Sequence, residues 1–213
     1  MLPKRRRAAV IVAHPDDETL WCGGFIMDHS TWEWHVICLC RADDPDRAPK
    51  FRRVVEHLGA TGSIGALDDS PAQPSLAGDE VRDTVKSLLP RGRFDLVFTH
   101  GPLGEYTRHR RHEECCRAVV ALWQASLLHT GLLCLFAYDD GGGAYAPQVR
   151  ADADRRYRLS PDTMRRKRDI IIRFYGFSDQ SWEARITPEV EGFQCFRSPV
   201  EAARRVAAVE VTT

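Results

Sequence analysis

Ala8-Ala9-Val10-Ile11-Val12-Ala13 leads directly into His14-Pro15-Asp16-Asp17-Glu18, and the fold class follows from this stretch. A short, unbroken run of apolar residues is typical of a strand that is buried on both faces. The segment that follows, Asp17–Asp28, begins with acidic residues, as helices often do. A buried strand followed at once by a helix is the repeating unit of a parallel α/β sheet.

The same alternation continues along the chain. Further strands are predicted at Trp34–Cys40, Ser63–Leu67, Phe94–Thr99 and Leu132–Tyr138. Further helices are predicted at Pro49–Leu58, Asp79–Leu89 and His112–Leu128. Strands and helices that alternate in this way predict an α/β fold in which helices cover both faces of a mostly parallel sheet.

The C-terminal third is less regular. Asp139–Leu159 has no clear periodicity and contains three consecutive glycines, so we predict a long loop that is functional or mobile. Ser160-Pro161 is typical of a helix start, and the helix is predicted to run to Phe174. Gly192–Val211 predicts one short strand and a final helix. Without repeats or an obvious linker, we predict a single domain over residues 1–213.

Composition excludes some classes of function. The 213 residues carry 30 basic and 30 acidic side chains, and this balance argues against a protein that coats nucleic acid. Basic clusters at Lys4–Arg7 and Arg165–Arg168 are interpreted as solvated surface patches. No apolar run approaches the roughly 18 residues that span a bilayer, and Ala8–Ala13 is too short for a signal peptide. We therefore expect a cytoplasmic protein.

The seven cysteines form no paired CxxC motif, so reduced and mostly buried thiols are expected. Cys38 and Cys40 are two apart in a predicted strand and share one of its faces. Cys116 continues an apolar stripe at helical spacing. These positions are interpreted as packing sites.

The turn after the first strand carries three adjacent carboxylates, at Asp16, Asp17 and Glu18. One interpretation is that they cap the following helix, whose N-terminal amides attract negative charge. The other is that they bind a cation together with His14. Catalytic zinc commonly takes three ligands from His, Asp or Glu and leaves one position for water. His14 and Asp17 could supply two of them.

A second polar cluster follows the strand at Phe94–Thr99, beginning at His100 and including His109 and His112. Ligands bind beyond the carboxyl ends of strands in open parallel sheets, so both clusters are expected at one edge. His112 could then supply the third ligand. The sequence contains no HExxH, GxGxxG, P-loop or GxSxG motif, so the usual signatures of zincins, dinucleotide-binding proteins, P-loop enzymes and serine hydrolases are absent.

These residues resemble a known family. Ala13-His14-Pro15-Asp16-Asp17-Glu18 after a first strand is similar to the signature of the LmbE-like/PIG-L deacetylase superfamily. Thr99-His100-Gly101-Pro102, Gly104-Glu105-Tyr106 and His109-x-x-His112 resemble its second metal motif. Arg47, Lys167 and the stretch 174–178 resemble further family features, and the resemblance covers roughly residues 8 to 196.

The resemblance implies a Rossmann-like three-layer sandwich and hydrolysis of N-acetyl groups, often on glucosamine-containing substrates. It implies that His14, Asp17 and His112 bind zinc. Asp16 would then be the general base, and His109 the general acid or oxyanion partner.

Three departures from the family are visible. The family often has His-Pro-Asp-His where this chain has His109-Arg110-Arg111-His112, so the Asp that could orient a catalytic histidine is missing. One extra residue separates Tyr106 from His109, and Lys50 stands where many relatives carry Glu.

We therefore expect a zinc-dependent N-deacetylase with one Zn²⁺ per chain, although Fe²⁺ could also occupy two histidines and a carboxylate. Its partner would be a small acylated amine, without nucleic acid or a membrane span, and a homo-oligomer is possible. Arg47, Tyr106 and Arg110 are the predicted substrate-binding residues. The cluster Arg108–Arg111 is either exposed to solvent or attracts an anionic substrate, and Asp139–Leu159 could be a lid.

Two alternatives remain. One is an amidase that acts on a non-sugar acyl amide or a thiol conjugate, with the same ligand set. The other is a non-catalytic metal-binding protein of the same fold.

Overall fold

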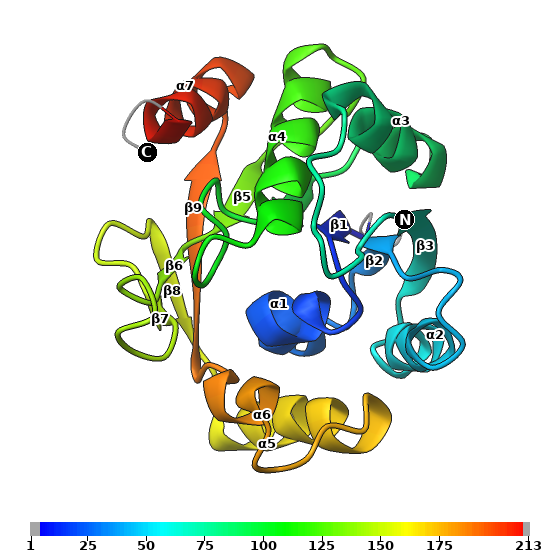
Figure 1. Cartoon of the computed structure of the whole chain (residues 1–213), viewed down its shortest axis with the longest axis vertical. Coiled ribbons are helices and arrows are strands. Elements are labelled where there is room, and N and C mark those ends of the chain that lie inside the picture. The colour runs from blue at the N-terminus through cyan, green and yellow to red at the C-terminus, as the bar shows by residue number, and fades with distance from the viewer. Residues whose placement is uncertain (1–4, 211–213) are drawn as a thin grey trace.

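A computed structural model describes residues 5–210, and in it a seven-stranded sheet lies between two layers of helices (Figure 1). The strand order is β3-β2-β1-β4-β5-β9-β8. Five neighbouring strands are parallel, namely β3 (Thr61–Leu67), β2 (Glu33–Cys40), β1 (Arg7–Val12), β4 (Leu96–Thr99) and β5 (Leu133–Phe136). The expected α/β sandwich with a mostly parallel central sheet is confirmed.

Two antiparallel strands complete the sheet. β9 (Val190–Phe196) pairs with β5, and β8 (Arg155–Arg158) pairs with β9 at the edge. A separate two-stranded sheet joins β6 (Tyr138–Asp139) to β7 (Gln148–Val149).

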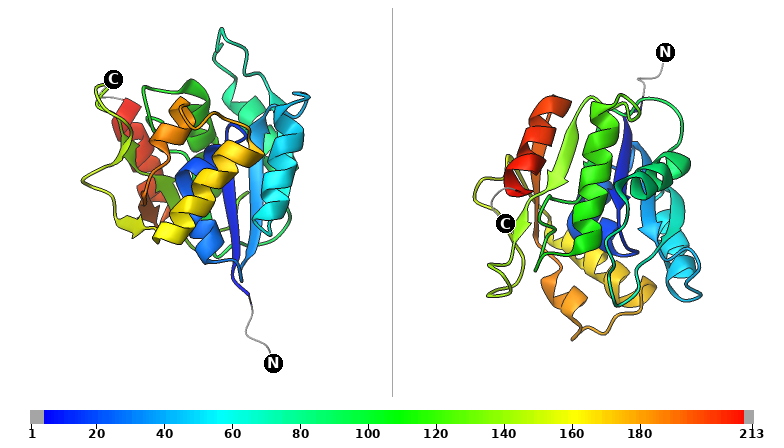
Figure 2. Two further views of the ribbon diagram at one scale, coloured as in Figure 1. Left: turned by 90° about the horizontal axis from the view of Figure 1, so that it is seen from below. Right: turned by 45° about the horizontal axis from the view of Figure 1, so that its top comes forward.

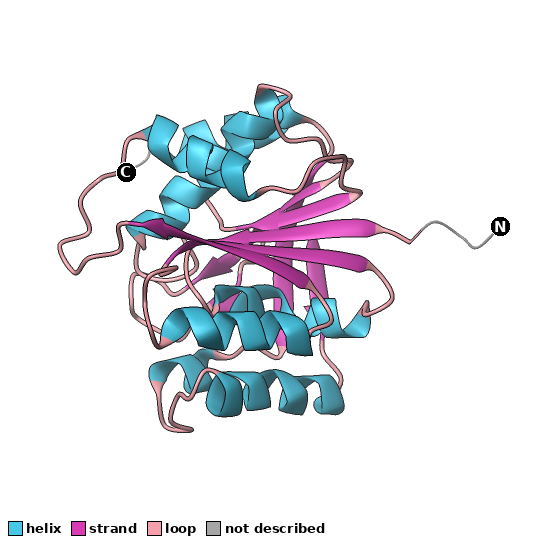
Figure 3. Cartoon of the chain, turned by 90° about the vertical axis from the view of Figure 1, so that its right-hand side faces the viewer, coloured by secondary structure: helices cyan, strands magenta, loops and turns pink. Residues whose placement is uncertain are grey.

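Helices cover both faces of the sheet, as the side view shows (Figure 3). One layer holds α1 (Asp17–Asp28), α2 (Arg47–His57), α5 (Pro161–Asp169) and the short α6 (Trp182–Ile186). The opposite layer holds α3 (Gly78–Leu88), α4 (Arg110–Gln124) and α7 (Pro199–Glu210), which lie side by side in the right-hand view of Figure 2. Between α5 and α6, Ile170–Phe174 forms a π-helical turn.

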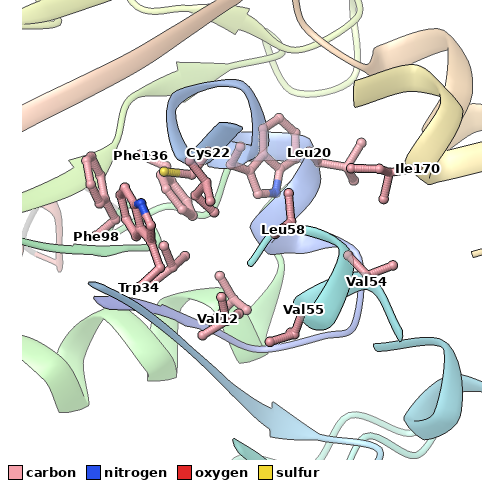
Figure 4. Close-up of a cluster of buried hydrophobic side chains, with 14 of the residues drawn as sticks. Val12, Leu20, Cys22, Trp34, Val54, Val55, Leu58, Phe98, Phe136 and Ile170 are labelled. Atoms are coloured by element: carbon pink, nitrogen blue, oxygen red, sulfur yellow. The ribbon is translucent and has the colours of Figure 1, made fainter. Parts of the chain in front are cut away.

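The central strand β1 shows why the sheet needs both layers. Ala8, Val10 and Val12 face the core beneath α1 and α2, while Ala9 and Ile11 face the core beneath α3 and α4. All five side chains are fully buried, as the unbroken apolar run requires. Part of the first core is drawn in Figure 4, where Val12 lies near Val55 and Leu58.

Most predicted elements are confirmed, with boundaries that shift by a few residues. The predicted strand at 132–138 is divided between β5 and β6, and the predicted helix at 161–174 ends in the π-helical turn. Lys4 of the first basic cluster and Val211 of the last predicted helix lie outside the described residues.

Two expectations are wrong. Asp139–Leu159 is not a structureless loop, because β7 and the edge strand β8 lie within it. The cysteines are not all thiols, because the antiparallel register of β9 on β5 brings Cys195 beside Cys134 and the two form a disulfide. Cys22, Cys38, Cys40, Cys115 and Cys116 are buried free thiols, as expected.

A buried ion pair joins the C-terminal segment to α1. Lys167 of α5 donates to Glu191 of β9 at 2.7 Å, and both side chains are fully buried. The Glu191 carboxylate also accepts hydrogen bonds from the backbone N–H groups of Gly24 and Phe25 in the middle of α1. This contact holds in place the helix that begins at Asp17.

Among the helices of residues 5–210, none has the length and apolar character needed to cross a membrane.

Candidate metal centre

The predicted metal ligands come together where neighbouring strands end. His14 follows β1, Asp17 is the first residue of α1, and His112 lies in the first turn of α4. β1 and β4 are adjacent and parallel, so the turn after β1 and the segment after β4 reach the same edge of the sheet. The sheet therefore brings together two segments that are about a hundred residues apart in the chain.

Three potential ligand atoms form a nearly equilateral triangle. His14 Nδ1 lies 3.2 Å from both Asp17 Oδ2 and His112 Nε2, and the last two atoms are 3.3 Å apart. The corners of a tetrahedron whose centre lies about 2.0 Å away are about 3.3 Å apart, which is the arrangement that zinc prefers. These three donors fit a tetrahedral cation with one position left for a further ligand.

Each histidine of the triangle has a second ring nitrogen, which points away from the triangle and which we call the outer nitrogen. In both histidines this nitrogen is hydrogen-bonded to a carboxylate. His14 Nε2 is 3.1 Å from Asp69 Oδ1, and His112 Nδ1 is 2.6 Å from Glu105 Oε2. A proton on each outer nitrogen leaves a lone pair on the nitrogen that faces the triangle. Histidine ligands of metals are usually oriented in this way.

A third histidine, His100, lies against this centre. It stacks on His112 with ring centroids 3.8 Å apart, and its Nε2 is 3.4 Å from Asp17 Oδ2. Glu105 and Asp17 outweigh burial and raise the pKa of His100 to about 9. However, the backbone N–H of Ala13 points at Nε2 from 3.0 Å. That contact requires a lone pair on Nε2, so we take His100 as neutral, with its proton donated to Glu105.

Besides the triangle, two overlapping sets of side chains in the described part of the chain place their potential donor atoms close enough to hold a metal ion. They are His14, His109 and His112, and Asp17, His100 and His112. His112 is common to both and lies at the centre of the cluster.

The three adjacent carboxylates have different surroundings. Asp17 accepts from the backbone N–H of His14 and from the indole N–H of Trp21. Glu18 is fully buried and accepts from Tyr175 at 2.7 Å. Asp16 makes no side-chain cap hydrogen bond. The interpretation that these side chains serve only to cap the helix therefore fails for Asp16.

Asp16 faces a cavity beside the triangle. Burial and the negative charge of Asp17 raise its pKa well above the usual range for an aspartate. Arg47 Nη1, at 3.4 Å from Asp16 Oδ2, offsets part of that effect. The backbone of Asp16 has a φ of 113°, a value that residues other than glycine rarely adopt. Strained residues of this kind cluster at functional sites.

His109 also faces this cavity, and its ring stacks on that of His112 with centroids 4.3 Å apart. Burial and the neighbouring His112 lower its pKa to about 3, so it is neutral at pH 7. Its Nδ1 is buried and has no hydrogen-bond partner among the described residues. Arg111, at the position where the family motif quoted above has aspartate, binds Glu114 and the backbone carbonyl of Asp68 and makes no hydrogen bond to this ring.

The basic cluster divides into three different environments. Arg108 makes a bidentate pair with Glu113, at 2.8 and 2.9 Å. Arg111 is 2% exposed and binds Glu114 and the backbone carbonyl of Asp68. Arg110 is exposed and lines neither cavity beside the metal centre.

The cavity next to the triangle has a volume of about 280 Å³, and we call it the reaction cavity. His14, Asp16 and Asp17 line it. The predicted residues Arg47 and Tyr106 also line it, together with Arg41, which binds Asp69. It is a small polar cavity in which carboxylates, imidazoles and guanidinium groups face one another.

Sequence reasoning missed the roles of Asp69, Glu105, His100 and Arg41. Glu105 and His100 lie in the motif quoted above, but their spacing does not say which ring they support. Asp69 stands in Asp68-Asp69-Ser70-Pro71, which is typical of an ordinary turn. Only the position of β3 at the edge next to β2 brings Asp69 towards His14.

Comparison with solved structures shows the same fold in several proteins. An N,N'-diacetylchitobiose deacetylase from Pyrococcus horikoshii is 18% identical, with a TM-score of 0.66 over 90% of this chain and 84% of that one. A deacetylase of the antimicrobial A40926 pseudoaglycone is 14% identical, with a TM-score of 0.64 over 91% and 98%.

A third similar structure is that of a protein named for a different reaction. It is a 4-carboxy-2-hydroxymuconate hydratase from Pseudomonas putida, 14% identical, with a TM-score of 0.62 over 90% of this chain and 96% of that one. No curated protein matches the chain.

The sequence itself gives the more specific relationship. Residues 9–123, which include most of β1, the triangle and most of α4, match the family described as PIG-L, GlcNAc-PI de-N-acetylase. The matched segment is more than half of the chain and contains all three potential ligands. The protein belongs to the PIG-L (LmbE-like) family.

Proposed function

We propose that this protein is a metal-dependent hydrolase that removes an N-acetyl, or other N-acyl, group from an amino sugar or a related small molecule. One observation carries the proposal: three donor atoms at tetrahedral spacing lie beside a buried carboxyl group that faces a cavity. The family match supports the proposal that the reaction is a deacetylation.

His14, Asp17 and His112 would hold the metal, which we propose is Zn²⁺. When bound, zinc supplies a Lewis acid and lowers the pKa of a water to about 7. The neutral histidines and the anionic Asp17 suit zinc, and they also suit Fe²⁺.

Asp16 is the proposed general base. Its carboxylate takes a proton from the attacking water as the oxygen adds to the amide carbonyl carbon. Because burial and Asp17 raise the pKa of Asp16, the group can hold that proton and release it later. When the C–N bond breaks, the leaving amine needs a proton, and Asp16 can return the one it took.

His109 fits one of its two predicted roles better than the other. With a pKa of about 3, it is a neutral imidazole and not a ready proton donor. Its N–H can still hydrogen-bond to the negative charge that develops on the carbonyl oxygen. Arg47 and Tyr106 line the same cavity and would contact the substrate. Arg110, which is exposed, could reach only a part of the substrate that projects into solvent.

Release of the free amine tests the proposal. Zinc-loaded protein is incubated with N-acetylglucosamine and its glycosides, and the free amine is measured. The Asp16→Asn variant should keep one zinc per chain and lose about 10²-fold or more in kcat. Full activity in that variant would remove Asp16 from the reaction, and no amine release from any acylated amine would refute the hydrolase.

The alternative amidase shares every residue of this site, so only the substrate separates it. The same assay with longer acyl amides and thiol conjugates decides between them. A hydratase has the same fold, so the fold alone does not select the reaction. The non-catalytic alternative is disfavoured because Asp16 is kept buried at a cavity without a capping role.

A further inference from the structure

A second cavity, which we call the side cavity, opens beside the reaction cavity. Its volume is about 880 Å³. Tyr106, His109, Trp182 and Glu183 line both cavities. The two cavities are therefore adjacent, and a molecule held at the triangle and reaching past His109 would enter the side cavity.

Exposed aromatic rings line the side cavity. Four large hydrophobic side chains are exposed in the described part of the chain, and two of them, Tyr145 at 45% and Trp182 at 37%, line this cavity. Trp182 also packs edge-on against Tyr106, with ring centroids 4.4 Å apart. Exposed aromatic surface gathered in a concavity indicates a place where an apolar ligand binds.

The wall that carries Tyr145 is held in place. Asp140 accepts hydrogen bonds from the backbone and hydroxyl of Thr107, at 2.8 and 2.6 Å. The Tyr145 hydroxyl donates to Asp139 at 2.6 Å. Gly141, Gly142 and Gly143 all have positive φ, which only glycine adopts easily. A fixed wall of this kind lowers the entropy lost on binding.

The two cavities differ in their chemistry. His14, Asp16 and Asp17 line the reaction cavity, and neither they nor the buried His112 line the side cavity. His109 marks the boundary. In the proposed reaction the water is activated beside Asp16, so the acetyl group lies in the reaction cavity. The rest of the substrate, on the amine side, is then the part that passes His109.

We propose that the side cavity is a binding subsite for an apolar or aromatic group attached to the amine-bearing part of the substrate. This inference rests on the proposed deacylase function. It predicts that the protein prefers an amino sugar with an aryl substituent over the same sugar without one, because Tyr145 and Trp182 present aromatic surface to that substituent.

Two glycosides test the preference. The zinc-loaded protein is given methyl N-acetylglucosaminide and 4-methylumbelliferyl N-acetylglucosaminide, and amine release is measured for each. We expect kcat/KM to be at least about tenfold higher for the aryl glycoside. Tyr145→Ala should reduce this ratio at least about fivefold. The matched control is Leu127→Ala, which removes an exposed apolar side chain that lines neither cavity and should leave the ratio unchanged.

Binding of the aryl glycoside by calorimetry gives a second measurement that needs no turnover. Equal kcat/KM for both glycosides, unaffected by Tyr145→Ala, would overturn the subsite while the deacylase proposal stands. Tyr145-dependent binding without any amine release would support the subsite and refute the proposed reaction. A preference that follows the length of the acyl chain, and that Tyr145→Ala removes, would overturn the assignment to the amine side.

Discussion

The two histidines of the triangle are supported by carboxylates in contrasting surroundings. His112 and its partner Glu105 are fully buried. Glu105 also accepts hydrogen bonds from His100 and from the backbone N–H of Gly101. The side chain of His14 is 15% exposed, and its partner Asp69 is shared with the exposed Arg41. One side of the centre is closed by the core, and the other opens onto the reaction cavity. We therefore expect the buried side to contribute more to metal affinity than the open side.

The largest effect is expected from the buried ligand itself. His112→Ala removes the donor that is common to the triangle and to both other potential ligand sets. Zinc content, measured by elemental analysis after gel filtration, should fall from about one ion per chain to near zero. Unchanged zinc content would refute the ligand role of His112 and with it the contrast between the two sides.

Glu105→Gln should produce the next largest effect. Both oxygens of Glu105 accept hydrogen bonds: Oε2 from the two histidines and Oε1 from Gly101. An amide group would turn one acceptor into a donor that faces another donor, with no solvent to relieve it. Zinc affinity, measured by chelator competition, should fall about 10- to 100-fold.

Asp69→Asn is the matched change on the open side. Its amide group can face Arg41, which is exposed and free to move away, while the oxygen still accepts from His14. We expect zinc affinity to fall no more than about tenfold in the same competition assay. A loss as large as that of Glu105→Gln would break the contrast.

Arg111→Met should have the smallest effect on the metal. Arg111 holds the carbonyl of Asp68, and so positions the turn that presents Asp69 to His14. Zinc affinity should fall about threefold, and the change should not add to that of Asp69→Asn, since both act through one contact. Additive losses would show that Arg111 acts by another route, and thermal unfolding of each variant would separate that route from a loss of stability.

The sequence predicted the parts of the site that depend on local signals. His14, Asp17 and His112 each stand where a strand ends or a helix begins, so the sheet topology sufficed to bring them together. Asp69 and Arg41 were missed because their part in the site depends on how two turns at the edge of the sheet fold towards each other. Whether the proposed ligands bind a metal remains a prediction.

The C-terminal region was less predictable for a physical reason. Arg155-Arg156-Tyr157-Arg158 forms β8 at the edge of the sheet, where one row of backbone groups is open and polar side chains are common. Its composition resembles that of a loop. The Cys134–Cys195 pair was missed because it depends on the antiparallel return of β9, over a separation of 61 residues. That residues 1–213 form one domain also stays a prediction.

The buried ion pair between Lys167 and Glu191, which is hydrogen-bonded to the middle of α1 and which we call the clamp, supports a part of the chain that carries the family signature. The matched segment ends at residue 123, and both partners of the clamp lie beyond it. Yet the helix they secure is the one that presents Asp17. A fragment that ends at residue 123 would therefore retain all residues of the signature but lose the contact that holds α1, and with it Asp17, in place.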